Sequence, residues 1–455
     1  MADDDLIRRH QACFPPWIPT FYERPLVITG GDGRRLTDAE GHSYLDFYSG
    51  VATSILGYRV PEVWDAVAKQ LRTGVVHISP YYIDETRVVL AEKIAELSGI
   101  PDAKVVFTLT GSEAVDLALS LAALHRRSNQ VLALRHAFHG TSYGAMAVTG
   151  DRRWVGMGLA PFHVSHVRGG YDRYHGVYRE LDDAAYTEAC TRDLTEVIGV
   201  STADRVAAMI FEPVQGVAGG APLAAGLLRA YQPILRQEEI LLISDEVQTG
   251  WGRTGRHLWG YQHHDVVPDL LVFGKGTGAG FPIGGVVGRA EVLESMSGIR
   301  MSATSGDPLS VVAASVTIDY VRSRDLPANA DRVGSLLLEG LRREVLGSAI
   351  VADVRGQGLM IAIELADPAT GDLASEVAVR VQETCRRNGL LVGLGGTEEQ
   401  CVSLLPPLTL TEAEGREGLA AIVSAVRSVE HERVRSVEPD RPETGGAAPR
   451  PKAAP

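Results

Sequence analysis

One stretch decides the fold: Asp269-Leu-Leu-Val-Phe-Gly-Lys275-Gly-Thr-Gly-Ala-Gly280. In it, an apolar run ends in glycines that surround a single lysine. The run before Gly274 predicts a buried strand, and the glycines predict a tight turn directly after it. Thirty positions upstream of Lys275, a second apolar run, Leu241-Leu-Ile-Ser-Asp245, ends in a carboxylate. Strand ends of this kind form the ligand crevice of an open α/β sheet. We therefore expect the amine of Lys275 and the carboxylate of Asp245 to face one crevice.

This pair of groups has the chemistry that a pyridoxal 5'-phosphate (PLP) cofactor requires. A lysine amine forms an imine with the aldehyde of the cofactor, and a carboxylate keeps its pyridine nitrogen protonated. The two strand ends therefore indicate a PLP site in which Lys275 and Asp245 are the catalytic residues.

The rest of the chain predicts an α/β protein. Apolar runs alternate with longer helical patterns, which is typical of βαβ units and predicts a mostly parallel sheet flanked by helices. The runs lie at 104–109, 131–135, 206–211, 240–245, 270–273 and 284–287. Apolar and polar residues alternate over 27–47, which predicts short antiparallel strands. Residues 85–97 predict a helix and residues 358–365 a further strand.

Both chain ends are predicted to build a small α+β domain beside this large one. We expect an N-terminal segment of the small domain (residues 1–60), a large PLP-binding domain (61–324) and the C-terminal part of the small domain (325–435). Residues 436–455 hold five prolines and no aromatic residue. This composition predicts a disordered tail.

Composition excludes several classes of function. The 44 basic and 57 acidic residues give a net charge of −13, which argues against a nucleic-acid partner and against an anionic membrane surface. No apolar run is long enough to span a membrane, and the first residues are acidic where a signal peptide would be basic. We therefore expect a cytoplasmic location. The four cysteines lie far apart without CxxC spacing, so no metal site or disulfide framework is expected.

A phosphate-binding site is predicted at Gly111 and Ser112. They follow the strand 104–109 and open an amphipathic helix that continues to about residue 127. Free amides at a helix N-terminus attract an anion, and the serine hydroxyl either binds it or caps the helix. Residues 274–279 also fit a relaxed dinucleotide pattern, but no ribose-binding carboxylate follows at the expected distance.

Two further strand ends carry polar or aromatic side chains. His136-Ala-Phe138-His139-Gly140 follows the run at 131–135, and Phe138 is placed either over the pyridine ring or in the core. Ile210-Phe-Glu212 ends another run in a carboxylate before a turn. Four strand ends with an amine, carboxylates and phosphate donors indicate one shared site.

With these motifs in order, the chain resembles the class III PLP-dependent aminotransferases, a group of fold type I. The resemblance covers about residues 20 to 430. It rests on Thr110-Gly-Ser-Glu-Ala114, Phe138-His-Gly140, Glu212-Pro-Val-Gln-Gly216, Asp245-Glu-Val-Gln-Thr-Gly-Trp-Gly-Arg-Thr-Gly255 and Gly274-Lys-Gly276. Ser305-Gly-Asp307-Pro308-Leu309 is most similar to dialkylglycine decarboxylase, a decarboxylating member of the family.

The resemblance implies a role for each of these residues. Lys275 holds the cofactor and then moves a proton, and Asp245 pairs with the pyridinium. Val247 packs on the ring face opposite Phe138, with His139 beside the ring, and Gln248 lies near the phenolic oxygen. Gly111 and Ser112 bind phosphate, and Thr304 reaches the phosphate in the partner subunit of a homodimer with sites at the subunit interface.

The first departure from the family concerns the substrate. The family places an arginine before Pro-Pro-Leu to hold a substrate carboxylate, whereas this chain reads Gln400-Cys-Val-Ser403-Leu-Leu-Pro406. Glu212 would pair with that arginine and so lacks its partner. Our hypothesis is that Glu212 faces an amine of a polyamine or aminosugar-type substrate; the alternative is that another arginine replaces the clamp.

The second departure concerns the loop before Pro308. The family's threonine slot falls on Ala303, one residue before Thr304, so this loop is shifted or Thr304 makes no phosphate contact. Asp307 is expected to cap the loop rather than to hold a cation.

Three function classes stay open. The first is an aminotransferase, which moves nitrogen from an amine donor to a carbonyl acceptor through the pyridoxamine phosphate form. The second is an epimerase, aminomutase or decarboxylating transaminase of the same family; Val51 and Ser403 replace the carboxylate-binding side chains of the decarboxylase. The third is a non-catalytic binding module, against which Lys275, Asp245 and Gln248 argue together.

Overall fold

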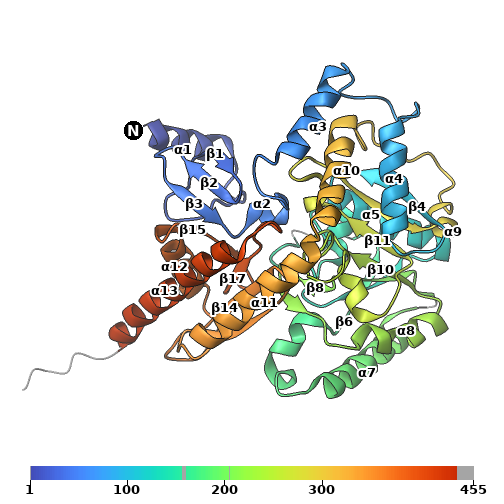
Figure 1. Ribbon diagram of the computed structural model, residues 1–455. Helices are drawn as coiled ribbons and strands as arrows, with labels where there is room; N and C mark the ends of the chain where they lie inside the picture. The colour runs from blue at the N-terminus through green and yellow to red at the C-terminus, as the bar shows by residue number, and fades with distance from the viewer. Residues whose placement is uncertain (1, 156–159, 204, 438–455) are drawn as a thin grey trace, which may run out of the picture.

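A computed structural model describes residues 2–155, 160–203 and 205–437 of the chain (Figure 1). Its centre is a sheet in the order β4-β12-β11-β10-β7-β5-β6. The strands are β4 Ala103–Thr108, β5 Gln130–Leu134, β6 His163–Val167, β7 Ala208–Phe211, β10 Leu241–Asp245, β11 Leu270–Phe273 and β12 Gly284–Arg289. Each predicted apolar run is therefore a strand of one sheet.

The central sheet is mostly parallel, as predicted. Strands β11, β10, β7, β5 and β6 pair in parallel. Only β12 runs against its two neighbours, β11 and β4. All residues of β7, β10 and β11 are buried, because helices cover both faces of the sheet and exclude water from both. The fold class, an α/β protein, is confirmed.

The helices pack on the faces and the rim of this sheet in Figure 1. Helix α5 begins at Gly111, directly after β4, and buries seven apolar residues of its inner face. The helices of this part are α3 Pro61–Arg72, α4 Glu85–Leu97, α5 Gly111–Arg126, α6 Tyr143–Val148, α7 Asp183–Ser201, α8 Leu227–Gln237, α9 Ala290–Leu293 and α10 Pro308–Ser323. Short 3-10 turns are η1 Gly170–Tyr174, η2 Gly176–Tyr178, η3 Gly260–His264 and η4 Lys275–Gly278, and β8 Val214–Gln215 pairs with β9 Ala221–Pro222.

Both chain ends meet in two smaller sheets on one side of the molecule (Figure 1). The first has the order β1-β2-β3-β15, in which β15 Leu390–Leu391 pairs with β3 Ser43–Asp46 beside β2 Arg35–Asp38 and β1 Ile28–Asp32. The short antiparallel strands predicted for residues 27–47 are thereby confirmed. The second has the order β13-β14-β17-β16.

The second small sheet lies among long C-terminal helices. Its strands are β13 Val351–Gln357, β14 Met360–Leu365, β16 Gly393–Gly395 and β17 Cys401–Leu404. The helices are α11 Leu326–Val345, α12 Ser375–Arg387 and α13 Glu412–Val437, with α1 Ala2–Cys13 and α2 Ser49–Ala52 at the other end of the chain. The three predicted boundaries between the four segments stay predictions. Of the predicted tail, Ser436 and Val437 belong to α13, and 438–455 lie outside the described residues.

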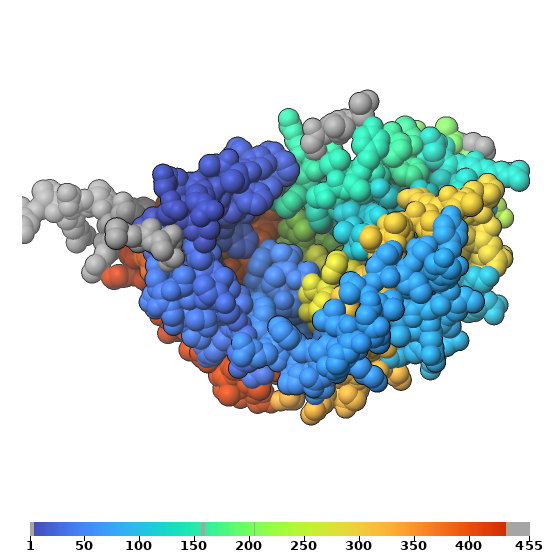
Figure 2. Space-filling view, turned by 90° about the horizontal axis from the view of Figure 1, so that it is seen from above, coloured from blue at the N-terminus to red at the C-terminus, as the bar shows by residue number. Residues whose placement is uncertain are grey.

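Seen from above, the molecule is hollowed between the N-terminal segments and the part of the chain coloured yellow (Figure 2). Over the described residues, no helix combines the length and the apolar character that crossing a membrane needs.

Candidate active site

A cavity of about 200 Å³ lies at the carboxyl ends of the central strands. Its lining comes from the loops after β4, β5, β7, β10 and β11, which the parallel arrangement brings to one edge of the sheet. The lining residues are Gly111, Ser112, Phe138, His139, Gly140, Thr141, Glu212, Asp245, Val247, Gln248, Thr249 and Lys275. The structure therefore brings together every predicted site residue except Thr304.

Asp245 is held by two hydrogen bonds at the end of β10. One carboxylate oxygen lies 2.7 Å from Nδ1 of His139, and the other accepts the amide of Val247 at 3.0 Å. The side chain of His139 is fully buried, and its own amide donates to the hydroxyl of Thr149 at 3.1 Å. His139 thus fixes the orientation of Asp245, a supporting role that its position next to Phe138 in the sequence did not reveal.

Lys275 begins the turn η4 with a left-handed backbone (φ 39°), a conformation that is uncommon for a side chain-bearing residue. Its amine donates to Oε1 of Gln248 at 2.9 Å. Burial lowers the pKa of Lys275, and the charges of Asp245 and Glu212 oppose this effect. A lowered pKa favours the neutral amine, which is the form that reacts with an aldehyde.

The N-terminus of helix α5 faces the cavity through Gly111 and Ser112, and the first amides of a helix have no partner within the helix. Thr110 caps this helix by accepting the amide of Glu113 at 3.2 Å, so Ser112 is not the cap. Instead, the Ser112 hydroxyl accepts the amide of Thr141 at 3.1 Å. A Cβ on Gly140 would overlap the side chain of Ser112, which explains the glycine there. Thr141 was missed from the sequence, although it directly follows the Phe138-His-Gly140 motif.

Phe138 and Val247 supply apolar walls. The ring of Phe138 contacts Trp154 edge to face with centroids 4.8 Å apart. The methyl groups of Val247 lie so close to the chain at Gly111 that a Cβ there would approach them to 2.8 Å. Both side chains line the cavity and offer apolar contact to a ring.

Glu212 carries a buried carboxylate at the end of β7. One oxygen accepts the amide of Phe138 at 2.9 Å and the other accepts that of Gly216 at 3.2 Å. Burial raises the pKa of Glu212 to about 7, the nearby His139 lowers it and the charge of Asp245 raises it further. Ser403 lies buried on β17. Within the described residues, no arginine lines the cavity, so the alternative in which another arginine replaces the clamp gains no support there.

Thr304 lies on an exposed turn and is absent from the cavity wall of its own chain. A contact with the phosphate of a partner subunit stays a prediction. Asp307 caps helix α10 by accepting the amides of Leu309 and Ser310 at 3.1 and 3.0 Å, which is the capping role that the sequence predicted.

The residues present fit PLP. Lys275 and Asp245 line the same cavity and would supply an amine for the aldehyde and a carboxylate for the pyridine nitrogen. Phe138 and Val247 offer apolar faces for a ring, and the N-terminus of helix α5 with Ser112 offers donors for a phosphate.

Comparison with known proteins points to one family. The family model described as "Aminotransferase class-III" matches residues 20–426. The chain is 31% identical to an acetylornithine aminotransferase of Caldanaerobacter subterraneus, over 88% of this chain and 94% of the relative. It is also 31% identical to a leucine/methionine racemase of Thermococcus litoralis, over 95% and 98% of the two chains. A crystal structure of a PMP-bound aminotransferase from Vibrio fluvialis superposes with a TM-score of 0.84 at 28% identity, covering 90% and 94%.

Proposed function

Because the chain belongs to the class III aminotransferase family, with the fold type I architecture and PLP as its cofactor, we propose that its net reaction is transamination. It moves an amino group from a small amine donor to a carbonyl acceptor. The observation that carries this proposal is the meeting of Lys275, the Asp245–His139 pair and the N-terminus of helix α5 in one cavity. Bound PLP supplies an electron sink for the carbon that carries the substrate amine.

Individual residues of the chain carry out proton transfer, hold the cofactor ring protonated and bind its phosphate. Lys275 moves the proton, because its amine has a lowered pKa and faces the cavity. Asp245, oriented by His139, keeps the ring nitrogen protonated. Gln248 accepts a hydrogen bond from the free Lys275 amine at 2.9 Å and so directs it into the cavity before the cofactor binds. Ser112 and the first amides of α5 bind the phosphate.

Glu212 and Ser403 indicate the substrate class. No salt bridge of Glu212 occurs among the described residues, and the two amide donors leave its carboxylate facing the cavity. A second, cationic amine of a diamine, polyamine or aminosugar would neutralise it. Ser403 in the place of the family's arginine removes the group that holds a carboxylate, which disfavours an α-amino acid as the main substrate.

A homodimer is part of the proposal. Tyr81, Tyr82 and Ile83 are 73%, 66% and 91% exposed, and Ile299 is 89% exposed. These four large side chains are left in water, and Ile299 lies in the loop that leads to Thr304. Such exposure fits a surface that a second copy covers. The cytoplasmic location stays a prediction.

A second candidate is racemisation or epimerisation, which the relative named a leucine/methionine racemase favours. It needs the same lysine and ring, so the net reaction must be measured. A panel of mono- and diamines, aminosugars and amino acids is incubated with the holoenzyme without a carbonyl acceptor. Stoichiometric conversion of the cofactor to its pyridoxamine form, detected by absorbance, supports transamination. Inversion of the substrate without this conversion supports the second candidate.

A further inference from the structure

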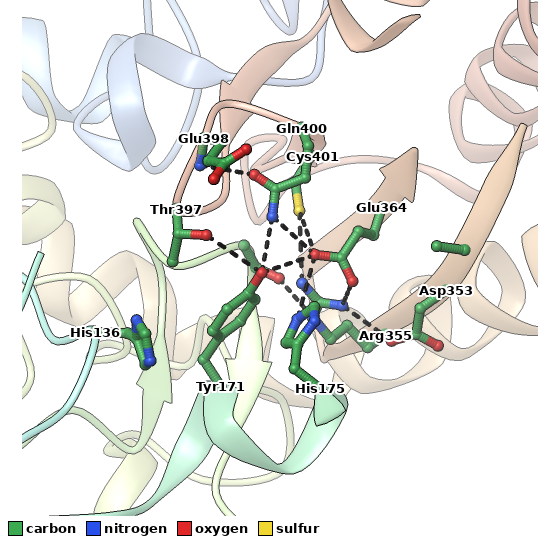
Figure 3. Close-up of polar contacts among 12 residues, drawn as sticks. His136, Tyr171, His175, Asp353, Arg355, Glu364, Thr397, Glu398, Gln400 and Cys401 are labelled. Carbon is green, nitrogen blue, oxygen red and sulfur yellow. Dashed lines mark hydrogen bonds and ion pairs between the residues drawn. The ribbon is translucent and has the colours of Figure 1, made fainter. Parts of the chain in front are cut away.

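A buried polar network lies where strands β13, β14 and β17 of the small sheet meet the turn η1 (Figure 3). Its centre is the ion pair between Arg355 on β13 and Glu364 on β14, whose nitrogen and oxygen lie 2.8 Å apart. Both side chains are only 2% exposed. Glu364 also accepts hydrogen bonds from the hydroxyl of Tyr171 at 3.0 Å and from Nε2 of Gln400 at 2.9 Å. We call Arg355, Glu364, Tyr171 and Gln400 the Arg355 network.

The Arg355 network holds the loop that carries Glu212 (residues 212–220, the Glu212 loop). Nε of Arg355 donates to the carbonyl of Gly219 at 2.9 Å. The amide of Tyr171 donates to the side chain of Gln215 at 2.8 Å, and Gln215 in turn donates to the carbonyl of Arg135 at 2.8 Å. The loop is therefore fixed at two points on the side away from the cavity.

The same loop faces the cavity with its other side. Glu212 lines the cavity and accepts the amide of Gly216. A Cβ on Gly216 would overlap the amide of Gln248, the residue that holds the amine of Lys275. A displacement of Gly219 is thus transmitted over a few residues to the groups that meet the substrate.

The register of the small sheet explains how the side chain of Arg355 reaches Gly219 of the Glu212 loop. Arg355 lies opposite Ala362, and Ala362 lies opposite Ser403, in one row across three strands. The central alanine is short and leaves room on this face, and the guanidinium contacts both Gly219 and the sulfur of Cys401, which is 3.5 Å away. Arg355 is not free to bind a substrate carboxylate in place of the missing clamp, because Glu364 neutralises it.

We propose that Arg355 and Glu364 are positioning residues that set the place of the Glu212 loop, and through it the binding of the amine substrate. The inference rests on the proposed function only for the identity of that substrate. The part that concerns the loop is independent of it, because hydrogen exchange measures the loop without turnover.

The test compares variants of the holoenzyme. R355K keeps the charge but loses the Nε donor to Gly219. The double variant R355M/E364M replaces the pair by apolar side chains of similar length, a replacement that proteins often tolerate without loss of stability. This variant is used if R355K does not fold. The control is R34K, because Arg34 forms a two-pronged ion pair with Glu414 at 2.8 to 3.1 Å and neither residue lines the cavity.

We expect faster amide exchange in residues 214–220 and a KM for the amine raised about tenfold, since small misplacements of substrate-binding groups have large effects. Turnover at saturation and PLP affinity should change less than the KM, because Asp245 on β10 and Lys275 after β11 lie outside the Glu212 loop. R34K should leave the exchange and the KM unchanged. Exchange and KM equal to those of the control in a folded Arg355 variant overturn the inference. If the wild type converts no amine, the proposed function fails, and the exchange result alone decides the inference.

Discussion

The charge of the Glu212 side chain bears on which substrates the protein prefers. Its carboxyl has a pKa of about 7 in the folded protein, so it becomes charged as the pH rises through neutrality. A cationic second amine gains an ion partner only in the charged form, whereas a monoamine gains none.

We therefore expect the ratio of kcat/KM for a diamine to that for the matching monoamine to rise as the pH increases from 6 to 8. The variant E212Q should flatten this rise and reduce diamine activity about tenfold or more, since hydrogen bonds to charged groups contribute roughly 1.5–3 kcal/mol. Steady-state rates on both substrates across this pH range give the ratio. Equal losses on both substrates would discard the role of Glu212.

Lys275 provides the second test of a single residue. Borohydride reduction of the holoenzyme followed by peptide mapping should find the cofactor on Lys275. K275A should lose at least about a hundredfold in turnover, because it removes both the covalent attachment and the group that moves the proton. A modified peptide at any other lysine, or an alanine variant with free turnover, contradicts this assignment.

At the scale of elements, the strand ends that carry the site residues could be predicted from the sequence. The side-chain hydrogen bonds that hold these residues in place could not. Each buried strand is an unbroken apolar run followed by glycine or a polar residue, so the sequence alone places Lys275, Asp245 and Glu212 at one edge of the sheet. Strand β6, His163–Val167, was missed because two histidines interrupt a short strand at the sheet edge.

The Arg355 network was also missed from the sequence. Tyr171 and Gln400 are separated by 229 positions and Arg355 from Gly219 by 136, and no local pattern links side chains over such distances. For the same reason, the hydrogen bond between Gln248 and Lys275 was not anticipated: only the folded turn brings the two side chains together.

The contact between helix α5 and the loop of Gly140 leads to a prediction about the phosphate-binding site. Gly140 has a φ of 137° and packs on Ser112, so G140A strains the backbone and displaces the serine. PLP affinity should fall at least about tenfold, which corresponds to 1.4 kcal/mol of lost binding. Fluorescence titration of the apoenzyme with PLP measures it. G199A is a suitable control, because a Cβ on Gly199 meets no other atom; an equal effect of both would refute the steric argument.

At the scale of the whole molecule, the exposed side chains of Tyr81, Tyr82 and Ile83 bear on assembly. I83E should convert a dimer to a monomer, because a charge would be buried in the interface. Sedimentation velocity at micromolar concentration measures the mass. V200E is the matched control, since Val200 is also strongly exposed (78%) but lies at the end of α7. A dimer that survives I83E locates the interface elsewhere.

The pairing of β15 with β3 has a consequence for biosynthesis. Leu390 pairs with Leu45, and Leu391 with Asp46, so the first hairpin leaves the ribosome long before the strand that completes its sheet. At elongation rates of roughly 5–20 residues per second, that delay is on the order of 20 to 70 s. During this interval the edge of β3 that will pair with β15 leaves its backbone amides and carbonyls unpaired, so another chain can pair with it and start aggregation.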